Sequence, residues 1–276
     1  MESKRSSRSL KAIARVICIA SAAMLFMGGS PTYAQGWHFG VGSGFTWMNI
    51  QGDEGYNIAN YGPVQYELDL DPDDISDVLE SAFGFAGYAS NGTWMIQYSL
   101  GWFTLGGEGT VDLPAEVGGG TLDIDLDYDV TNIKVAVGRT VYRSQNMKFS
   151  FTPYVGLRYL KHDISADFVI NQGGEHTPVY RGRDWNWTDA LVGVGVGYQL
   201  RPKLSWNAGG DAGFGGSDGT FFFTTNLTVS PTRHFSFGPN FSYTALDYEN
   251  GNKGDADWYL YDADEFGVGI FAVVNF

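Results

Sequence analysis

Alternation of apolar and polar residues with a period of two constrains this chain more than any other feature of its sequence. In one segment, every second position carries a large apolar side chain: Trp94, Ile96, Tyr98, Leu100 and Trp102. The same pattern returns in segments that begin near residues 149, 192, 221, 235 and 266. Successive side chains of a β-strand point to opposite faces, so the pattern predicts strands with one apolar face.

Three details of these segments favour strands that cross a membrane. Each runs for about 9 to 12 residues, the length that a tilted strand needs to span a bilayer. Their second face consists of Gly, Ser, Thr and Asn with few charges, as a narrow lumen requires. Aromatic residues stand near the ends of the apolar faces, where interfacial girdles form: Trp37, Trp47, Trp94, Trp102, Trp206, Tyr198 and Tyr243. Because backbone groups in lipid must pair with one another, we predict an all-β fold, a closed transmembrane antiparallel up-and-down β-barrel.

The composition excludes several other classes of protein. Glycine accounts for 38 of 276 residues, aromatic residues for 16% and charged residues for 17%. A disordered chain is poor in aromatic residues and rich in charge, and a coiled coil is rich in Ala, Glu, Lys and Leu. The net charge is −14, and no basic cluster follows the first fifteen residues, so we expect no nucleic-acid partner.

The first 34 residues have the pattern of a cleaved signal peptide. Five basic residues precede an apolar run of 12 residues, Val16 to Met27, and Thr32-Tyr33-Ala34 supplies a cleavage site. The run is too short for a transmembrane helix. Cleavage would remove the only cysteine, Cys18, and leave 12 basic against 30 acidic residues, a charge of −18. We therefore expect a signal peptide over 1–34 and a single barrel domain over 35–276.

The connections between the apolar segments predict the number of strands. Short connections lie at 90–92, 143–146, 201–203 and 230–233. They alternate with long ones at about 50–80, 106–120, 167–184 and 248–263, and with a shorter one near 215–218. Four turns and five loops imply ten strands, or eight if the connection near 215–218 is misread. The predicted spans are about 36–49, 81–90, 93–105, 121–142, 147–166, 185–200, 204–214, 219–229, 235–247 and 264–276.

The end of the chain carries a resemblance to a known class. Alternation through Ile270 and Val274 ends on a terminal Phe276 and resembles the carboxy-terminal recognition signal of Gram-negative outer-membrane β-barrels. Phe271 stands where those proteins usually carry a glycine. The resemblance covers residues 35–276 and implies short periplasmic turns, longer acidic external loops and location in the cell outer membrane. It also implies contact with outer-membrane lipid and lipopolysaccharide, and insertion by the barrel-assembly machinery through the C-terminal strand.

Four charged residues fall on lumen-facing positions of four successive predicted strands: Lys134, Arg158, Asp189 and Asp211. Arg158 and Asp189 lie on neighbouring strands. Buried charges are costly without partners, so we predict a polar network that fills the lumen. The alternative is a path for protons or ions. A wide solute pore is not expected, because a barrel of eight to ten strands is narrow.

Two acidic segments are predicted to lie above the membrane. In 122–129, four Asp residues share one strand face, and the apolar positions then change from even to odd numbers, for which we expect a bulge near Thr131 and Asn132. The first long connection, 50–80, holds nine acidic residues and no basic one. Within it, Asp71 and Pro72 predict an N-cap and a short helix over about 72–79. We interpret both segments as solvated, with divalent-cation or partner binding as the alternative.

Two short patterns raise the possibility of an enzyme at the barrel rim. Omptin proteases carry an Asp pair facing an Asp–His pair, which Asp125 and Asp127 with His162 and Asp163 resemble, although His162 and Asp163 are adjacent rather than two apart. Lipid A deacylases carry His-x-Ser, and His234 and Ser236 have this spacing but fall at the predicted periplasmic end. Our prediction is a non-enzymatic barrel, structural or surface-interacting, with no catalytic residue, cofactor or metal site. A rim enzyme and a narrow channel remain the alternatives.

Overall fold

The computed structural model describes residues 36–58, 62–112, 121–172 and 175–276. The expected signal peptide, 1–34, lies outside these ranges, so it stays a prediction. The elements in chain order are β1 (His38–Ile58), β2 (Gly62–Leu70), α2 (Pro72–Val78), β3 (Leu79–Ser90), β4 (Trp94–Asp112), β5 (Thr121–Arg139), β6 (Tyr142–Arg143), β7 (Phe149–Gln172), β8 (Glu175–Arg201), β9 (Leu204–Phe214), β10 (Gly219–Thr232), β11 (Phe235–Asn250) and β12 (Tyr259–Asn275).

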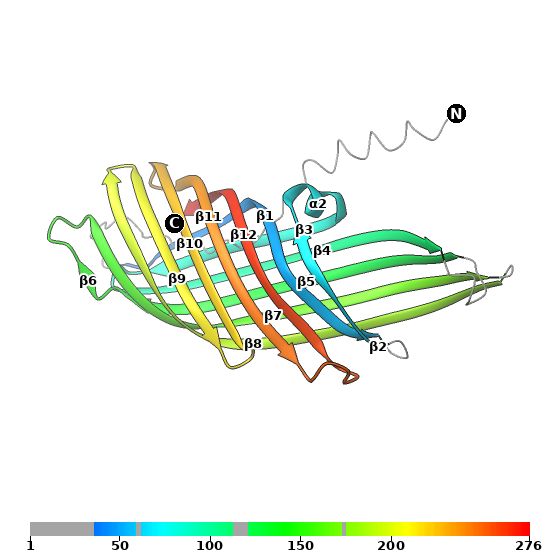
Figure 1. Cartoon of the computed structure of the whole chain (residues 1–276). Helices are drawn as coiled ribbons and strands as arrows, with labels where there is room; N and C mark the ends of the chain where they lie inside the picture. The colour runs from blue at the N-terminus through cyan, green and yellow to red at the C-terminus, as the bar shows by residue number, and fades with distance from the viewer. Residues whose placement is uncertain (1–35, 59–61, 113–120, 173–174) are drawn as a thin grey trace, which may run out of the picture.

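Ten of these strands form a closed antiparallel barrel (Figure 1). The ring runs β1-β3-β4-β5-β7-β8-β9-β10-β11-β12, and β12 pairs back with β1 from Gly40↔Asn275 to Tyr56↔Tyr259. Among the described strands, β2 and β6 lie outside the ring and pair with β1 and β7. The ten-stranded prediction is confirmed. The eight-stranded alternative is wrong, because the segment near 215–218 joins two full strands, β9 and β10.

The outer face of one zone of the barrel is apolar. Val155 and Leu157 on β7 and Val268 and Ile270 on β12 point outward and are 58–62% exposed. Six of the seven aromatic residues predicted to form girdles are exposed as well, Trp37, Trp47, Trp94, Trp102, Trp206 and Tyr198, whereas Tyr243 is half-buried. Acyl chains of a membrane cover such a surface in a transmembrane barrel. We call this zone the membrane belt; it includes Ile133–Val137 of β5, Phe149–Tyr159 of β7 and Phe266–Val274 of β12.

Above the membrane belt the two faces of the wall exchange character. On β5, Ile133, Val135 and Val137 face outward in the belt, whereas Val130 faces inward and Asp127 outward above it. We call this second zone the upper barrel; it includes Met48–Ile58 of β1, Leu160–Gln172 of β7 and Tyr259–Ala263 of β12. Its inward side chains form an apolar core with Leu160, Ile164, Trp185 and Trp187 among its members.

The exchange of faces occurs without a shift in strand register. The ladder between β4 and β5 is continuous through Thr131↔Trp102 and Asn132↔Gly101, and the ladder between β5 and β7 is continuous at the same level. The predicted bulge near Thr131 and Asn132 is therefore wrong. The apolar positions change from odd to even numbers because the surroundings of the wall change from lipid to water.

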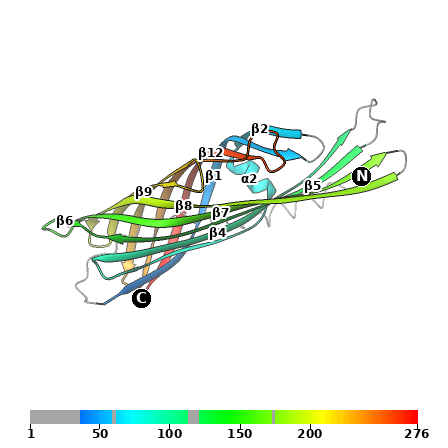
Figure 2. The same ribbon diagram turned by 90° about the horizontal axis from the view of Figure 1, so that it is seen from below.

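The long connections are also more regular than expected. Six strands continue into the segments that we expected to be loops: β1, β4, β7, β8, β11 and β12. The hairpins of β4 with β5 and of β7 with β8 extend well beyond the ends of β1 and β12 (Figure 2). Within the described residues, no helix has both the length and the apolar character to cross a membrane.

The one helix that was predicted, over 72–79, is present as α2. Asp71 accepts hydrogen bonds from the backbone N–H groups of Asp73 and Asp74, and Pro72 occupies the first turn, as expected for an N-cap followed by proline. Ile75 of α2 is buried in the apolar core of the upper barrel. The helix lies between β2 and β3, next to the region where β2 replaces β3 as the partner of β1.

Candidate functional site in the barrel lumen

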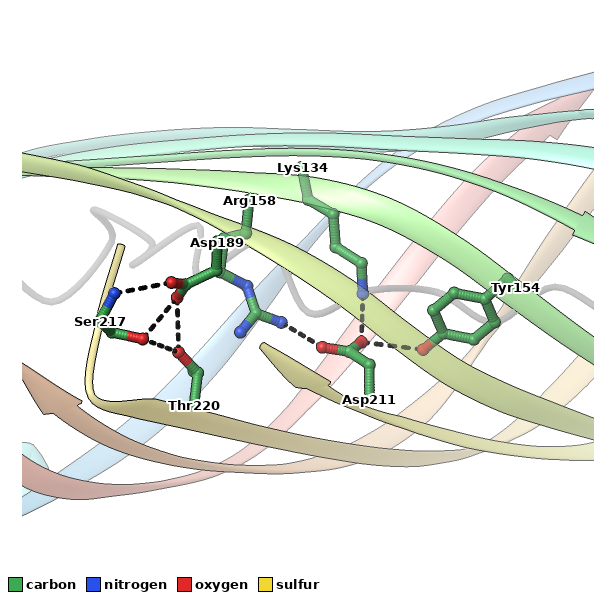
Figure 3. A network of polar contacts seen from close by, with 7 residues as sticks. All are labelled: Lys134, Tyr154, Arg158, Asp189, Asp211, Ser217 and Thr220. Carbon is green, nitrogen blue, oxygen red and sulfur yellow. Dashed lines mark hydrogen bonds and ion pairs between the residues drawn. The ribbon is translucent and has the colours of Figure 1, made fainter. Parts of the chain in front are cut away.

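Two cations share one carboxylate inside the membrane belt. Asp211 of β9 accepts from Lys134 Nζ at 2.5 Å and from Arg158 Nη2 at 2.7 Å (Figure 3). Tyr154 Oη also donates to Asp211, at 2.8 Å, and all these side chains are buried. The ring of Phe222 lies 5.3 Å from Lys134 Nζ and 5.6 Å from the Arg158 guanidinium, a cation–π arrangement. We call Lys134, Arg158 and Asp211 the ion triad.

The fourth predicted lumen charge, Asp189, makes a different set of contacts. Its backbone pairs with Arg158, yet its carboxylate accepts from the backbone N–H groups of Gly216 and Ser217 and from the hydroxyls of Ser217 and Thr220, at 2.7–3.0 Å (Figure 3). These donors belong to the short connection between β9 and β10 and to the start of β10. Asp189 therefore fixes that connection over the lumen, and Arg158, its neighbour in register, pairs with Asp211 instead.

A cavity of about 300 Å³ lies directly above the ion triad. Its wall is mostly apolar, with Met48, Phe103, Leu160 and Phe222 among the lining residues, and Arg158 contributes to the same lining. Leu70 of β2 and Val78 of α2 line it as well. This volume lies at the lower end of the range of small-molecule sites in proteins.

A buried glutamate at the top of this cavity is surrounded by tyrosine hydroxyls. Glu54 of β1 accepts from Tyr66 Oη at 2.8 Å and from Tyr259 Oη at 3.0 Å. His162 Nδ1 lies 2.7 Å from both Tyr128 Oη and Tyr259 Oη. Five elements supply the cluster: β1, β2, β5, β7 and β12. Our expectation that all acids of 50–80 are solvated is wrong for Glu54, which is 3% exposed.

Burial controls the protonation of this cluster, which lies above the membrane belt. Desolvation lowers the pKa of His162 from 6.5 to about 3, so the imidazole is neutral at physiological pH. Desolvation raises the pKa of Glu54, and the hydrogen bonds from Tyr66 and Tyr259 oppose that shift in part. Stacking of Trp185 on Tyr259, with ring centroids 4.2 Å apart, covers the cluster.

The residues of the two rim-enzyme hypotheses do not converge. Asp125 and Asp127 point outward from β5 and are exposed, whereas His162 points into the lumen and is buried. Asp163, next to His162, faces outward and pairs with Lys161 at 2.9 Å. The two residues of the His-x-Ser pattern also lie apart in environment. His234 is exposed at a turn, whereas Ser236 is buried, with its Oγ 2.9 Å from Ser230 Oγ. Among the residues that the structure describes, no three His, Cys, Asp or Glu side chains come together as a metal site requires.

Sequence reasoning missed most of the upper lumen. Glu54, Tyr128 and Tyr259 belong to no recognisable sequence motif. Phe222 faces the lumen, but it lies between two other phenylalanines of β10, so its sequence context does not distinguish it. A signal was present, since the apolar positions change parity in several strands: Phe45 and Trp47 are outward on β1, but Met48 and Ile50 are inward. The change on β5 is the one for which we predict a bulge, and the continuous ladders there exclude it.

Comparison with known proteins adds the following. No family model matches the chain, and no curated protein matches its sequence. Among solved structures, it is similar to the outer-membrane protease OmpT of Escherichia coli, with 7% identity over 90% of this chain and 100% of the other and a TM-score of 0.49. The translocator domain of the autotransporter NalP of Neisseria meningitidis has 12% identity over 96% and 93%, with a TM-score of 0.43. The attachment protein Ail of Yersinia pestis has 11% identity over 88% and 100%, with a TM-score of 0.34.

The closed ring and the membrane belt define the class of this protein. Ten antiparallel strands close without a free edge, and the outer face carries an apolar zone with aromatic residues at its borders. Both features are those of a transmembrane β-barrel of the outer-membrane type.

Proposed function

We propose that the protein is a non-enzymatic, non-conducting barrel of the cell outer membrane that acts by interaction at the cell surface. The ion triad carries this proposal. Lys134 and Arg158 extend across the lumen to Asp211 within the membrane belt, and their side chains are at most 2% exposed. Phe222 and Tyr154 pack against the same charges. A lumen filled in this way leaves no continuous path for hydrated solutes.

The outer face of the upper barrel supports a role at the surface. Exposed acids are distributed over several strands: Asp53, Asp125, Asp127, Asp167, Asp184 and Asp262. A surface of this charge attracts divalent cations, which can bridge it to the anionic groups of lipopolysaccharide. The long hairpins of β4 with β5 and β7 with β8 carry several of these acids away from the membrane belt.

Export and assembly complete the proposal. A signal peptide over 1–34 would direct the chain across the inner membrane. Ile270, Val274 and Phe276 point outward from the last strand and its end, with exposed fractions of 47–70%. This apolar edge is the surface that the barrel-assembly machinery would bind before β12 closes against β1.

Planar-bilayer recording tests the non-conducting barrel. We expect no steady conductance from the parent protein, whereas a general porin inserted in the same bilayer conducts. Asp127→Asn, outside the lumen, serves as the matched control for Lys134→Met within it. A steady parent conductance that Lys134→Met reshapes and Asp127→Asn leaves unchanged would instead assign a channel. Turnover of lipid A or of peptides by the purified protein in parallel assays would restore the rim-enzyme alternative.

A further inference from the structure

We propose that the cavity above the ion triad binds a single-chain amphiphile with a carboxylate head, of the class of a medium-chain fatty acid. The head would lie at Arg158 and the chain along the apolar wall. This inference goes beyond the surface role proposed above. It does not depend on the exposed acidic residues of the outer face.

The wall of the cavity matches an acyl chain. Met48 and Ile50 of β1, Phe103 and Leu105 of β4 and Leu160 of β7 face one another across it. Each additional CH₂ group that such a wall removes from water strengthens binding. A cavity of about 300 Å³ is twice the size of the ~150 Å³ apolar cavity that accommodates benzene, so it suits a ligand of roughly ten to twelve heavy atoms.

The floor of the cavity offers a cation with an unused donor. Arg158 Nη2 donates to Asp211, whereas Arg158 Nη1 is buried and has no hydrogen-bond partner among the residues that the structure describes. Within the ion triad, one carboxylate serves two cations. Glu265, which lines the same cavity, interacts electrostatically with Arg158 but forms no ion pair with it among the described residues. A buried donor without a partner destabilises the protein, and a carboxylate oxygen of the ligand would supply the missing acceptor.

The other acids around the lumen leave this donor open. Glu265 lines the same cavity, and its Oε1 accepts from Tyr261 Oη at 3.2 Å. Asp189 is held by Ser217 and Thr220. Among the described residues, Asp211 is the one carboxylate within ion-pair distance of Arg158. The ligand head would therefore make the second contact of the Arg158 guanidinium, opposite Asp211.

Calorimetric titration of decanoate into the full chain in phospholipid nanodiscs tests the proposal, since nanodiscs avoid competing detergent. We expect saturable binding at one site per chain. Methyl decanoate, which lacks the charge, should bind about tenfold more weakly, and decyltrimethylammonium, with the opposite charge, should show no saturable binding. Absence of saturable decanoate binding above that of empty nanodiscs would overturn the proposal.

A pair of glycine substitutions locates the site. Gly107 of β4 lines the cavity, and a Cβ atom built there meets no atom within 4 Å, so Gly107→Leu can add apolar volume at the cavity wall. Gly219, at the start of β10, is equally unobstructed but does not line the cavity, so Gly219→Leu is the matched control. We expect Gly107→Leu to weaken decanoate binding at least tenfold and Gly219→Leu to leave it unchanged. Equal affinities in the two variants would place the ligand elsewhere.

The position of the head is tested with Arg158→Lys, which keeps a cation beside Asp211 but removes Nη1. We expect about a tenfold loss for decanoate, the effect of one hydrogen bond to a charged group, and no change for methyl decanoate. Equal losses for both ligands would contradict a head at Arg158. If this variant fails to fold, the comparison of decanoate, methyl decanoate and decyltrimethylammonium on the parent protein decides the same question.

Discussion

Strand β5 passes through the membrane belt and the upper barrel without interruption, and its two faces have opposite character in the two zones. In the belt, Val135 faces outward and Lys134 faces the lumen. Eight residues towards the amino end of the strand, Asp127 faces outward, and Tyr128 faces the lumen beside His162. The backbone ladder is the same in both zones. The comparison teaches that the medium around a barrel, lipid or water, decides which face of a strand is apolar.

The two zones also differ in what fills the lumen. The belt contains the ion triad, held by charge-assisted hydrogen bonds to Asp211. The upper barrel contains stacked aromatic residues, including Trp187 on Tyr248 with ring centroids 3.9 Å apart. A lipid-facing wall gains little by burying apolar side chains inside, because its outer face already meets an apolar medium. The upper barrel, in water, depends on its apolar core in the way that a soluble domain does.

The largest effect is expected from breaking the ion triad. Asp211→Asn removes the carboxylate that pairs with both Lys134 and Arg158 and leaves two buried cations without an ion-pair partner, so we expect it to lower the free energy of unfolding by about 3–5 kcal/mol. Urea titration of protein folded in vesicles measures this value. Asp127→Asn, the same change on the outer face of the upper barrel, should have no measurable effect. Similar stabilities of the two variants would show that the lumen of the belt is hydrated.

The second-largest effect is expected from placing a charge on the outer face, which the membrane belt and the upper barrel should tolerate to different degrees. Val155→Arg places a charge on the lipid-facing side of β7 and should cost about 2–4 kcal/mol near the midplane. Asp167→Arg puts the same side chain on the same face of the same strand, but in the upper barrel, and should change stability by at most about 0.5 kcal/mol. The folded fraction that resists unfolding in unheated detergent gels measures both. A tolerated Val155→Arg would move the membrane belt away from this position.

Acid should loosen the upper barrel while leaving the belt intact. The buried His162 has a pKa of about 3 in the folded protein and 6.5 when unfolded. Its stabilising contribution is therefore complete above pH 6.5 and is lost as the pH falls towards 3, with a loss of about 2 kcal/mol at pH 5. Quenching of tryptophan fluorescence by acrylamide should increase between pH 7 and pH 5.

The control for this effect is His162→Gln, which cannot titrate. The raised pKa of Glu54 acts with the opposite sign, because burial favours its protonated form and acid therefore stabilises the fold. We expect His162→Gln to lose the acid-induced quenching and to show the weak protective trend of Glu54 instead. Quenching that persists unchanged in this variant would assign the pH response to other groups.

The smallest effect is expected at α2, whose N-terminus is capped by the Asp71 side chain. Asp71→Ala removes the acceptor for the N–H groups of Asp73 and Asp74 and should cost about 1 kcal/mol locally. Faster protease cleavage near 71–78 in intact vesicles measures it. Asp77→Ala, exposed in the last turn of the same helix, should leave the cleavage rate unchanged. Equal cleavage rates in both variants would mean that packing of Ile75 alone holds the helix.

The elements that could be read from the sequence are those set by local pattern. Ten strands, the short turns and the outward positions of the belt follow from a period of two, which is a property of each strand alone. The N-cap at Asp71 is local in the same sense, since its acceptor and donors lie within three residues. The inward positions of Lys134, Arg158, Asp189 and Asp211 also follow from alternation.

Only the closed barrel decides which of these residues meet. Arg158 and Asp189 are neighbours in register, yet the guanidinium reaches Asp211 one strand further away, because Asp189 is occupied by Ser217 and Thr220. Glu54, Tyr259 and His162 converge from strands at the start, the end and the middle of the chain. Alternation assigns a residue to a face, whereas the curvature and closure of the sheet set the distances across the lumen. Local pattern therefore specifies the wall of this barrel and the residues that face its lumen, whereas the closure of the sheet specifies which of those residues contact one another.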